Sequence, residues 1–355
     1  MENNNPEISI ILPCQNEAEA LPFCLAQIKK AIKENNLSAE IIVSDSSTDN
    51  SPEIAKKENV ILIKHDKDGY GIAYLEAFKI ANGKYIFMAD ADGTYDFNEI
   101  PHFLKQLKSG YDFVIGNRFG GKMEKEAMPW LHKLGNPLLS GTLRLFFGTS
   151  IKDSHCGMRA IKKDSLQKLN LQTTGMEFAS EMVIKALKNN LKIKELPINY
   201  YKRKGKSKLK PMADSWKHMR FMLLYSPLFL FLIPGLVFSL AGVASMFWFY
   251  FKNPGLMFFS SIFAISGYQL IIFSIFAKTY SITHLKEKPG FMNKIYKYLT
   301  IERASILGIL IILCGLLLGG LNAIKDSIIA LTIITIGVQT IFSSFMLSIL
   351  SIKEK

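Results

Sequence analysis

The sequence predicts an α/β domain with a mostly parallel sheet, followed by an α-helical transmembrane domain of four helices. Composition changes sharply near residue 227: almost every later stretch is apolar, whereas residues 1–226 mix charged and apolar side chains. Within this first part, β-branched or aromatic runs alternate with helical patterns, as in a sheet covered by helices on both faces. We therefore expect a soluble domain over residues 1–210, a juxtamembrane helix over 211–226 and a membrane domain over 227–355.

The expected strands of the soluble domain are short apolar runs, and amphipathic helical patterns separate them. In such a sheet, ligands bind beyond the carboxyl ends of the strands. Strands are expected at residues 8–12, 40–43, 60–63, 85–88 and 113–115, and helices at about 19–35, 51–58, 73–82 and 100–109.

Four later stretches reach the roughly 20 apolar residues that a helix needs to cross a bilayer. No charged side chain lies within their cores, which favours a membrane anchor over an ion or proton pathway. The spans are expected at about residues 227–251, 254–277, 304–321 and 327–350.

The orientation follows from the positive residues outside the spans. The connection at residues 278–303 carries six Lys or Arg, and the C-terminal tail is also basic. Positive loops stay in the cytoplasm, so with four spans we expect the N-terminal domain and the C-terminus to be cytoplasmic. The four cysteines show no paired spacing, which agrees with a reducing compartment, and no cleavable signal peptide is expected at the N-terminus.

The segment before the first span has the pattern of a helix at the membrane surface. Met212, Trp216, Met219 and Leu223 recur with helical spacing, and basic residues lie between them. A second candidate is the segment 138–147, for which ordinary packing on the domain is equally compatible with the pattern.

The formal charge of +13 concentrates at residues 202–210 and 278–303, beside apolar segments. This position favours membrane lipids and phosphorylated ligands, and no nucleic-acid-binding motif is present. We therefore expect no nucleic acid partner.

Polar residues follow three of the expected strands, at 13–17, 44–49 and 89–94. Asp45, Asp90 and Asp92 should thus meet at one edge of the sheet, where clustered carboxylates favour a divalent cation. The Asp90 and Asp92 side chains point the same way in an extended segment and suit Mg²⁺ or Mn²⁺ beside a diphosphate. The alternative is a capped turn before the next helix.

Three further clusters stand out. Residues 69–74 partly mimic a dinucleotide-binding motif, but the third glycine is missing, so we interpret them as a glycine turn that opens a helix. Residues 153–159 are mixed in charge. Residues 200–210 are strongly basic and suit either a loop around a phosphate or a patch facing acidic lipid headgroups.

In this order, the motifs resemble those of the family 2 glycosyltransferases, specifically the branch of dolichyl-phosphate mannose synthase and polyprenyl-phosphate glucosyltransferases. The resemblance covers about residues 7–210 and implies a GT-A fold, a Rossmann-like nucleotide-sugar domain. The segments that carry it are residues 13–17, 45–49, 90–92, 116–119, 153–159, 177–181 and 203–209.

The resemblance also implies site residues. Asp90 and Asp92 match the metal positions, while Thr94 stands where some relatives have a glutamine ligand, which leaves its part in metal binding open. The positions matching those that bind the nucleotide-sugar are Pro13, Gln15, Glu17, Val43, Asp45, Asp90 and Ala91. The positions assigned to the phosphates and the lipid acceptor are Arg118, His132, Lys133, Asn136, Arg203, Lys204, Ser207, Lys208 and Lys210.

The implied reaction is an inverting transfer of a hexose from GDP-mannose or UDP-glucose to a polyprenyl or dolichyl phosphate. A lipid phosphate is already largely dianionic at neutral pH and needs placement more than a general base. The residues expected to act in catalysis are Asp92, Arg118, Asp153 and Arg203, with a structural cap as the alternative role for Asp153.

Two other functions are weighed against this transfer. A processive polysaccharide synthase usually carries Gln-x-x-Arg-Trp, and this chain has no Arg-Trp pair. A non-catalytic membrane scaffold or regulator with a degenerate transferase domain is the other alternative, and the intact Asp90, Asp92 and Arg118 argue against it.

Overall fold

The computed structural model describes residues 5–205, 211–284, 300–319 and 324–351. It divides into two compact units, Met1–Met222 and Leu223–Lys355. The expected positions Ser207, Lys208 and Lys210, most of the basic connection 278–303 and the C-terminal tail lie outside the described residues.

The first unit is built on a sheet of seven strands in the order β3-β2-β1-β4-β6-β5-β7. Five strands are close to the expected ranges, and all pairs are parallel except those of β6, which runs antiparallel to β4 and β5. The strands are β1 (Ile8–Cys14), β2 (Ala39–Asp45), β3 (Ile61–Lys64), β4 (Tyr85–Met88), β5 (Phe113–Asn117), β6 (Arg159–Lys162) and β7 (Ile193–Pro197).

Strands β6 and β7 were not expected, because charged residues interrupt both of them. In β6 the side chain of Arg159 is nevertheless buried, since it donates hydrogen bonds to the backbone oxygens of Cys156, Ala179 and Ser154 at 2.7–2.9 Å. A pattern of apolar residues does not reveal a buried arginine whose partners come from elsewhere in the chain.

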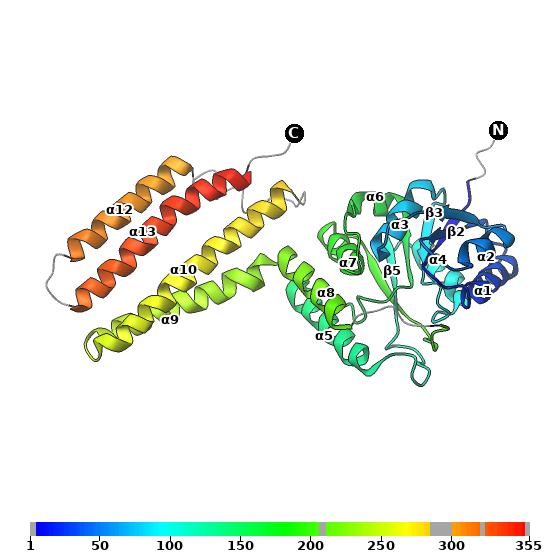
Figure 1. Cartoon of the computed structure of the whole chain (residues 1–355), viewed down its shortest axis with the longest axis horizontal. Coiled ribbons are helices and arrows are strands. Elements are labelled where there is room, and N and C mark those ends of the chain that lie inside the picture. The colour runs from blue at the N-terminus through cyan, green and yellow to red at the C-terminus, as the bar shows by residue number, and fades with distance from the viewer. Residues whose placement is uncertain (1–4, 206–210, 285–299, 320–323, 352–355) are drawn as a thin grey trace. The chain divides into compact units, whose positions relative to one another are not determined.

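The four expected helices of the soluble unit are observed within a few residues of their predicted ends. Helix α3 packs against α7, and α7 against α6, while α1 packs against α2 (Figure 1). The helices of this unit are α1 (Leu21–Glu34), α2 (Ser51–Lys57), α3 (Tyr70–Ile80), α4 (Ile100–Lys108), α5 (Trp130–Phe147), α6 (Lys163–Leu169), α7 (Phe178–Lys188) and α8 (Pro211–Tyr225), with a 3₁₀ turn at Phe97–Glu99.

Helices α5 and α8 each have at least one apolar side chain that is more than 60% exposed. On α5, the residues Asn136, Leu139 and Leu143 are buried, whereas Trp130 and Leu138 are each 69% exposed. On α8, His218 and Met222 are buried, whereas of the predicted apolar stripe Trp216 is exposed and Met219 and Leu223 are half-buried. The side chain of Met212 lies outside what the structure describes. A membrane-surface position stays a prediction for both helices.

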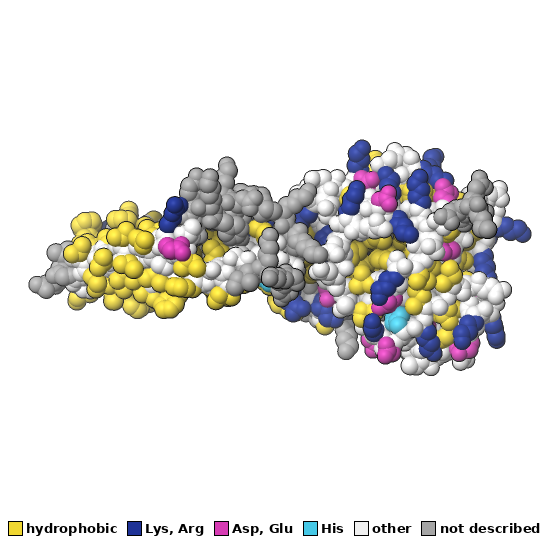
Figure 2. Space-filling view, turned by 90° about the horizontal axis from the view of Figure 1, so that it is seen from above, with side chains coloured by type: hydrophobic (Ala, Val, Ile, Leu, Met, Phe, Trp, Pro, Cys, Tyr) yellow, Lys and Arg dark blue, Asp and Glu magenta, His cyan; other side chains and the backbone are white. Residues whose placement is uncertain are grey.

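The second unit contains four helices long and apolar enough to span a membrane, counted over its described residues. They are Phe229–Tyr250, which comprises part of a π-helical turn (Leu228–Leu232) and α9 (Ile233–Tyr250), then α10 (Pro254–Thr283), α12 (Ile301–Gly319) and α13 (Ile324–Ser351). These helices lie close to the expected spans, and α10 runs six residues further than expected. Hydrophobic side chains cover most of their visible surface, whereas the visible surface of the first unit carries many Lys, Arg, Asp and Glu side chains (Figure 2). The chain is an integral membrane protein.

Small residues and hydroxyl groups hold these helices together. The backbone of Gly267 on α10 approaches that of Ser239 on α9 so closely that no Cβ fits at position 267. Between α10 and α13, the Oγ atom of Ser261 lies 2.7 Å from Oγ1 of Thr332. In a membrane, close backbone contact and interhelical hydrogen bonds are what drive helices together, because lipid tails are as apolar as the side chains.

Candidate active site

A cavity of about 490 Å³ opens at the carboxyl ends of the parallel strands. The loops after β1, β2 and β4 line it, together with the start of α3, the loop before β6, and residues of α5, α7 and α8. Three carboxylates (Glu17, Asp90 and Asp92) and three cationic side chains (Arg118, Arg203 and Lys217) are among its lining residues.

The loop after β1 is held in place by the loop after β2. The backbone N–H of Asn16 donates to Oγ of Ser47 at 2.7 Å, and Oδ1 of Asn16 accepts from the backbone of Thr48 at 2.8 Å. The N–H of Glu17 donates to Oγ of Ser51 at 3.0 Å. These bonds place the side chains of Gln15 and Glu17 on the cavity wall.

Asp90 follows β4 and lines the cavity, and one of its oxygens is unsatisfied. Its Oδ1 atom is buried and has no hydrogen-bond partner among the described residues. Burial and, next, the charge of Asp92 raise the pKa of Asp90 to about 7. A Cβ atom at Gly157 would lie 2.6 Å from Oδ2 of Asp90, so glycine there lets the two segments approach. A buried carboxylate without a partner calls for a cation or a proton.

Asp92 is held by its own loop and by Arg203. Its Oδ1 atom accepts from the backbone N–H and the hydroxyl of Thr94, at 3.0 and 2.6 Å, which assigns Thr94 a contact with Asp92. Its Oδ2 atom accepts from Nη1 of Arg203 at 2.7 Å. The other terminal nitrogen of Arg203 is bonded to Glu17, so Arg203 bridges two acids of the cavity.

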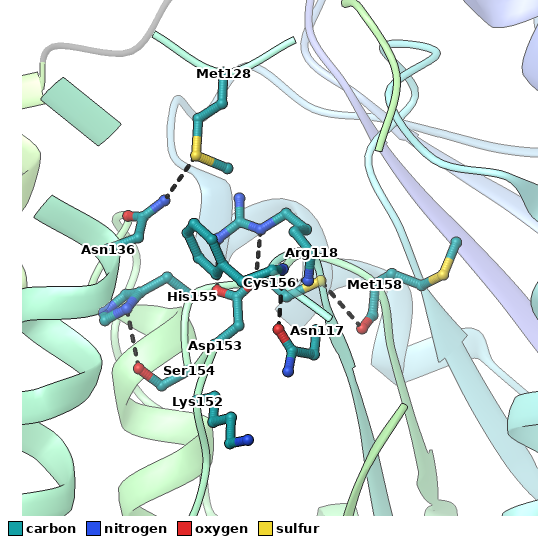
Figure 3. A network of polar contacts seen from close by, with 12 residues as sticks. Asn117, Arg118, Met128, Asn136, Lys152, Asp153, Ser154, His155, Cys156 and Met158 are labelled. Carbon is teal, nitrogen blue, oxygen red and sulfur yellow. Dashed lines mark hydrogen bonds and ion pairs between the residues drawn. The ribbon is translucent and has the colours of Figure 1, made fainter. Parts of the chain in front are cut away.

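Arg118 and Asp153 form a second, buried ion pair. Nε and Nη2 of Arg118 donate to the two oxygens of Asp153 at 2.7 Å each, and the backbone N–H of Arg118 donates to Oδ2 at 3.0 Å (Figure 3). Asp153 is fully buried and does not line the cavity, whereas Arg118 does. The guanidinium also lies 5.5 Å from the centre of the Tyr200 ring.

Strand β7 fixes the segment that carries Asp153. The carboxylate of Glu195 accepts from the backbone N–H groups of Lys152 and Asp153, at 2.8 Å each. Partial burial raises the pKa of Glu195 above its ordinary value. These two hydrogen bonds hold the backbone at Lys152 and Asp153 and so place the Asp153 carboxylate beside Arg118.

The glycine segment at the start of α3 has no phosphate-binding geometry. Gly69 has a φ of +148°, which favours glycine, and α3 begins at the next residue. The N–H groups of Gly71 and Ile72 donate to the backbone oxygen of Thr174 at 3.0 and 3.2 Å. Since these helix donors are used inside the protein, the interpretation as a glycine turn agrees with the structure.

The structure brings most of the expected site residues to one cavity. Val43 and Asp45 are fully buried and do not line it; Asp45 binds Ser47 instead. Lys133 is exposed on α5, and Lys204 lies over the ring of Phe23 at 3.4 Å, so neither lines it. The expected residues that do are Pro13, Gln15, Glu17, Asp90, Ala91, Asp92, Arg118, His132, Asn136 and Arg203.

Other cavity residues were missed by sequence reasoning. Tyr70 lies between the two glycines of a segment interpreted as a turn, and Tyr200 begins the basic cluster 200–210. Cys14, Ser46 and His155 lie in the segments 13–17, 44–49 and 153–159 that the sequence had indicated, but none of them was assigned to the site. Residues of α8 gave no sequence signal for the site, because that helix was assigned to the membrane surface. The lining residues that were not predicted as site residues are Cys14, Ser46, Gly69, Tyr70, Ala73, Tyr95, Leu139, His155, Gly157, Gly175, Met176, Ala179, Tyr200, Ser215, Lys217 and His218.

Cysteine chemistry is not available at this cavity. Burial raises the pKa of Cys14, Cys24 and Cys156 to about 12. Thiols with such pKa values stay protonated at neutral pH and are poor nucleophiles.

The donor set fits a hard divalent cation that is completed by a ligand. Among the described residues, no group of three or more His, Cys, Asp or Glu side chains is arranged to hold a metal alone. Asp90 with its unpartnered oxygen and Asp92 beside it supply two carboxylates. Mg²⁺ is commonly bound by one or two carboxylates together with substrate phosphates.

Two family models match the sequence. That of "Glycosyl transferase family 2" matches residues 9–169, and that of the "Glycosyltransferase family 2 C-terminal transmembrane region" matches residues 275–351. Together they account for both parts of the chain.

Relatives and solved structures agree with these matches. The low-salt glycan biosynthesis hexosyltransferase Agl6 of Haloferax volcanii is 36% identical over 365 residues, covering 96% of this chain and 88% of the relative. A dolichyl-phosphate hexose transferase of the same organism is 30% identical over 208 residues, covering 58% and 88%. The structure of glucosyl-3-phosphoglycerate synthase from Mycobacterium tuberculosis with Mn²⁺, UDP and glucosyl-3-phosphoglycerate aligns with a TM-score of 0.51 at 19% identity, covering 62% and 80%. At this identity the likeness shows a shared fold, GT-A.

Proposed function

The chain belongs to glycosyl transferase family 2, and we propose that it transfers a hexose, with inversion, from a nucleotide-sugar to a polyprenyl or dolichyl phosphate in the membrane. The observation that carries this proposal is the pairing, in one cavity, of Asp90 and Asp92 with the fixed cation of Arg118. The product would be a lipid-phosphate-linked sugar for glycan assembly. Agl6 and the dolichyl-phosphate hexose transferase, by their names, support a hexose and a lipid phosphate.

Charge supports a divalent cation as cofactor. Carboxylates and cationic side chains are balanced at three each among the residues named above, and a bound diphosphate would add further negative charge. Asp90 and Asp92 would hold Mg²⁺ or Mn²⁺. When bound there, the cation neutralises the charge that develops on the departing nucleoside diphosphate.

The protein's own residues would place the two substrates. The loop after β1 contributes Pro13, Gln15 and Glu17 to the cavity wall. The nucleotide would bind at this wall. Arg118 uses Nε and Nη2 for Asp153, which leaves the N–H groups of Nη1 for an anion. A lipid phosphate held there needs no general base, because it is already largely dianionic. Its alignment with the anomeric carbon of the sugar lowers the barrier to transfer.

Asp153 then acts by positioning Arg118 rather than by touching a sugar. Its carboxylate is fully buried and bonded to Arg118 through three donors. Breaking a buried pair of this kind typically costs about 3–5 kcal/mol. A role as base would require Asp153 to leave these partners.

The test uses the full chain in detergent with Mn²⁺ or Mg²⁺ and polyprenyl phosphate, and measures sugar-phosphate lipid from UDP-glucose and GDP-mannose separately. Product from one donor, lost on chelation and in Asp92→Asn, is the expected result. Asp66→Asn, at an exposed site, is the matched control and should retain activity. No lipid product from a broad panel of donors, despite nucleotide binding, would instead support a non-catalytic scaffold.

We further propose that the soluble unit and the C-terminus face the cytoplasm, as the basic connection 278–303 indicates. The test places a cysteine at the exposed position Lys30 and labels intact cells with a membrane-impermeant maleimide. Labelling only after lysis supports the orientation, and labelling of intact cells contradicts it.

A further inference from the structure

A chain of hydrogen bonds connects four parts of the soluble unit beside the cavity. Ser140 on α5 lies 3.0 Å from Ser154, oxygen to oxygen, and Oγ of Ser154 lies 3.0 Å from Nδ1 of His155. Nε2 of His155 lies 3.1 Å from Oγ of Ser180 on α7, which lies 2.9 Å from Nδ1 of His218 on α8. Figure 3 shows the bond between Ser154 and His155 next to Asp153 and Arg118.

The hydrogen atoms can be arranged so that each contact of this hydrogen-bond chain has one donor and one acceptor. Oγ of Ser140 accepts from the backbone N–H of Ser154 at 3.1 Å and can donate its own hydroxyl hydrogen to Oγ of Ser154. Ser154 then donates to Nδ1 of His155, Nε2–H of His155 donates to Ser180, and Ser180 donates to Nδ1 of His218. Both imidazoles are neutral in this arrangement. Burial, and next the neighbouring His218, lower the pKa of His155 well below its ordinary value, which agrees.

Most of this hydrogen-bond chain is buried, and His155, which lines the cavity, is half-buried. Ser140, Ser154 and Ser180 are fully buried, and His218 is 6% exposed. The rings of His155 and His218 meet edge to face, with centres 4.4 Å apart. Since a buried hydroxyl without a partner is costly, these groups favour one relative position of α7, α8 and the loop before β6.

Helix α8 packs on the soluble unit through buried side chains. Among its side chains up to residue 222 that the structure describes, only His218 and Met222 are buried. Ser215, Lys217 and His218 line the cavity, so this helix is one of its walls. The same helix leads, along the chain, into the first membrane span.

We propose that His218 is a positioning residue for the lipid acceptor: through Ser180 and His155 it fixes α8 to the loop that carries Asp153, and thereby fixes the distance between the α8 wall and Arg118. This rests on the proposed function. The lipid phosphate would bind between α8 and Arg118. The nucleotide would bind at the loops after β1 and β4, which contribute no residue to the hydrogen-bond chain. The consequence is a selective effect on the acceptor.

The test compares Ser180→Ala, His218→Gln and His218→Asn in the full chain with polyprenyl phosphate and its donor. Asparagine can reproduce the acceptor at the Nδ1 position, whereas glutamine places its amide near the Nε2 position. We expect Ser180→Ala and His218→Gln to raise the KM for the acceptor about 5- to 50-fold, as for a lost buried hydrogen bond, with the donor KM changed less than about 2-fold. His218→Asn should stay near wild type.

Ser165→Ala on α6 is the matched control, since it also removes a buried hydroxyl. Equal increases in both KM values, or His218→Asn as impaired as His218→Gln, would overturn the proposal. A wild-type protein that turns over no donor would defeat the proposed function instead. In that case, amide hydrogen exchange of α8 decides: faster exchange in His218→Gln than in His218→Asn supports the link, and equal exchange overturns it.

Discussion

The two arginines of the cavity are bound to carboxylates in opposite ways. Arg118 binds Asp153, which is buried behind the cavity wall, while Arg203 binds Glu17 and Asp92, which line the cavity themselves. The side chain of Arg118 is 8% exposed and that of Arg203 is 22% exposed. A ligand can therefore bind Arg118 without breaking its ion pair, whereas a cation at Asp92 must compete with Arg203.

Arg118 is therefore a fixed site for an anion, whereas Arg203 is an adjustable one. The Arg118 pair is oriented by a bidentate contact, by a backbone donor and by Glu195 beneath it. Arg203 lies in the segment that follows β7, and its Nε atom is buried without a hydrogen-bond partner among the described residues. A preorganised donor stabilises a transition state without rearrangement, and a movable one can respond to binding.

The largest effect is expected for Asp153→Asn, which leaves the buried charge of Arg118 without its counter-ion. We expect the free energy of unfolding of the soluble unit to fall by about 3–5 kcal/mol, and kcat/KM to fall with it. Thermal unfolding and turnover in detergent measure both. Asp112→Asn, which breaks the half-exposed pair with Lys162, is the control and should cost less than about 1 kcal/mol. Equal stability of the two variants would mean that Arg118 is not held as described.

Arg203→Met should separate two effects of opposite sign. Turnover should fall about 10- to 100-fold, as for a lost hydrogen bond to a charged group. Binding of Mn²⁺ to the protein without nucleotide should tighten by up to about 5-fold, because Asp92 loses a competing cation. Mn²⁺ titration followed by electron paramagnetic resonance measures the second effect. Lys202→Met, which removes a pair with the exposed Glu126, is the control, and weaker Mn²⁺ binding in Arg203→Met would contradict the comparison.

The fixed region also predicts a pH dependence of stability. The pKa of His155 is well below its ordinary value in the folded protein and near 6.5 when unfolded. Below about pH 6.5 the unfolded chain therefore binds a proton that the folded chain does not, so stability is full above this pH and falls as pH decreases, by up to about 1.4 kcal/mol per pH unit. Denaturant unfolding between pH 5 and 8 should show a smaller slope in His155→Asn. An unchanged slope would assign the acid sensitivity to other groups.

The smallest effect is expected at the edge of the adjustable region. Phe23→Leu removes the ring over which the Lys204 ammonium lies, a contact of about 0.5–1 kcal/mol at exposed sites. We expect the KM for the acceptor to change by less than about 3-fold, measured beside Phe78→Leu as a control. A larger change would show that binding of the acceptor depends on the contact between Lys204 and the Phe23 ring.

Sequence periodicity and motif order were sufficient for the two-part architecture, for five of the strands and for the loops that bear Asp90 and Asp92. They were insufficient for β6 and β7, since Arg159 in β6 is buried by backbone acceptors from three separate residues. They also left two alternative roles open for Asp153, in catalysis or as a structural cap. Its position behind Arg118 follows from a β7 carboxylate 42 residues away along the chain, a contact that no local pattern encodes.

Local composition by itself determined that this chain has a membrane-spanning part, because about 20 apolar residues in a row are sufficient to specify a span. It also determined where the acidic loops fall, since they end strands whose apolar pattern is local. Only the tertiary structure decided that α8 forms a wall of the cavity through His218, and that Val43, Asp45 and Lys133 do not line it. Whether a side chain faces a cavity depends on its contacts with segments distant in sequence. The spacing of residues along one helix or strand does not determine the free energy of those contacts.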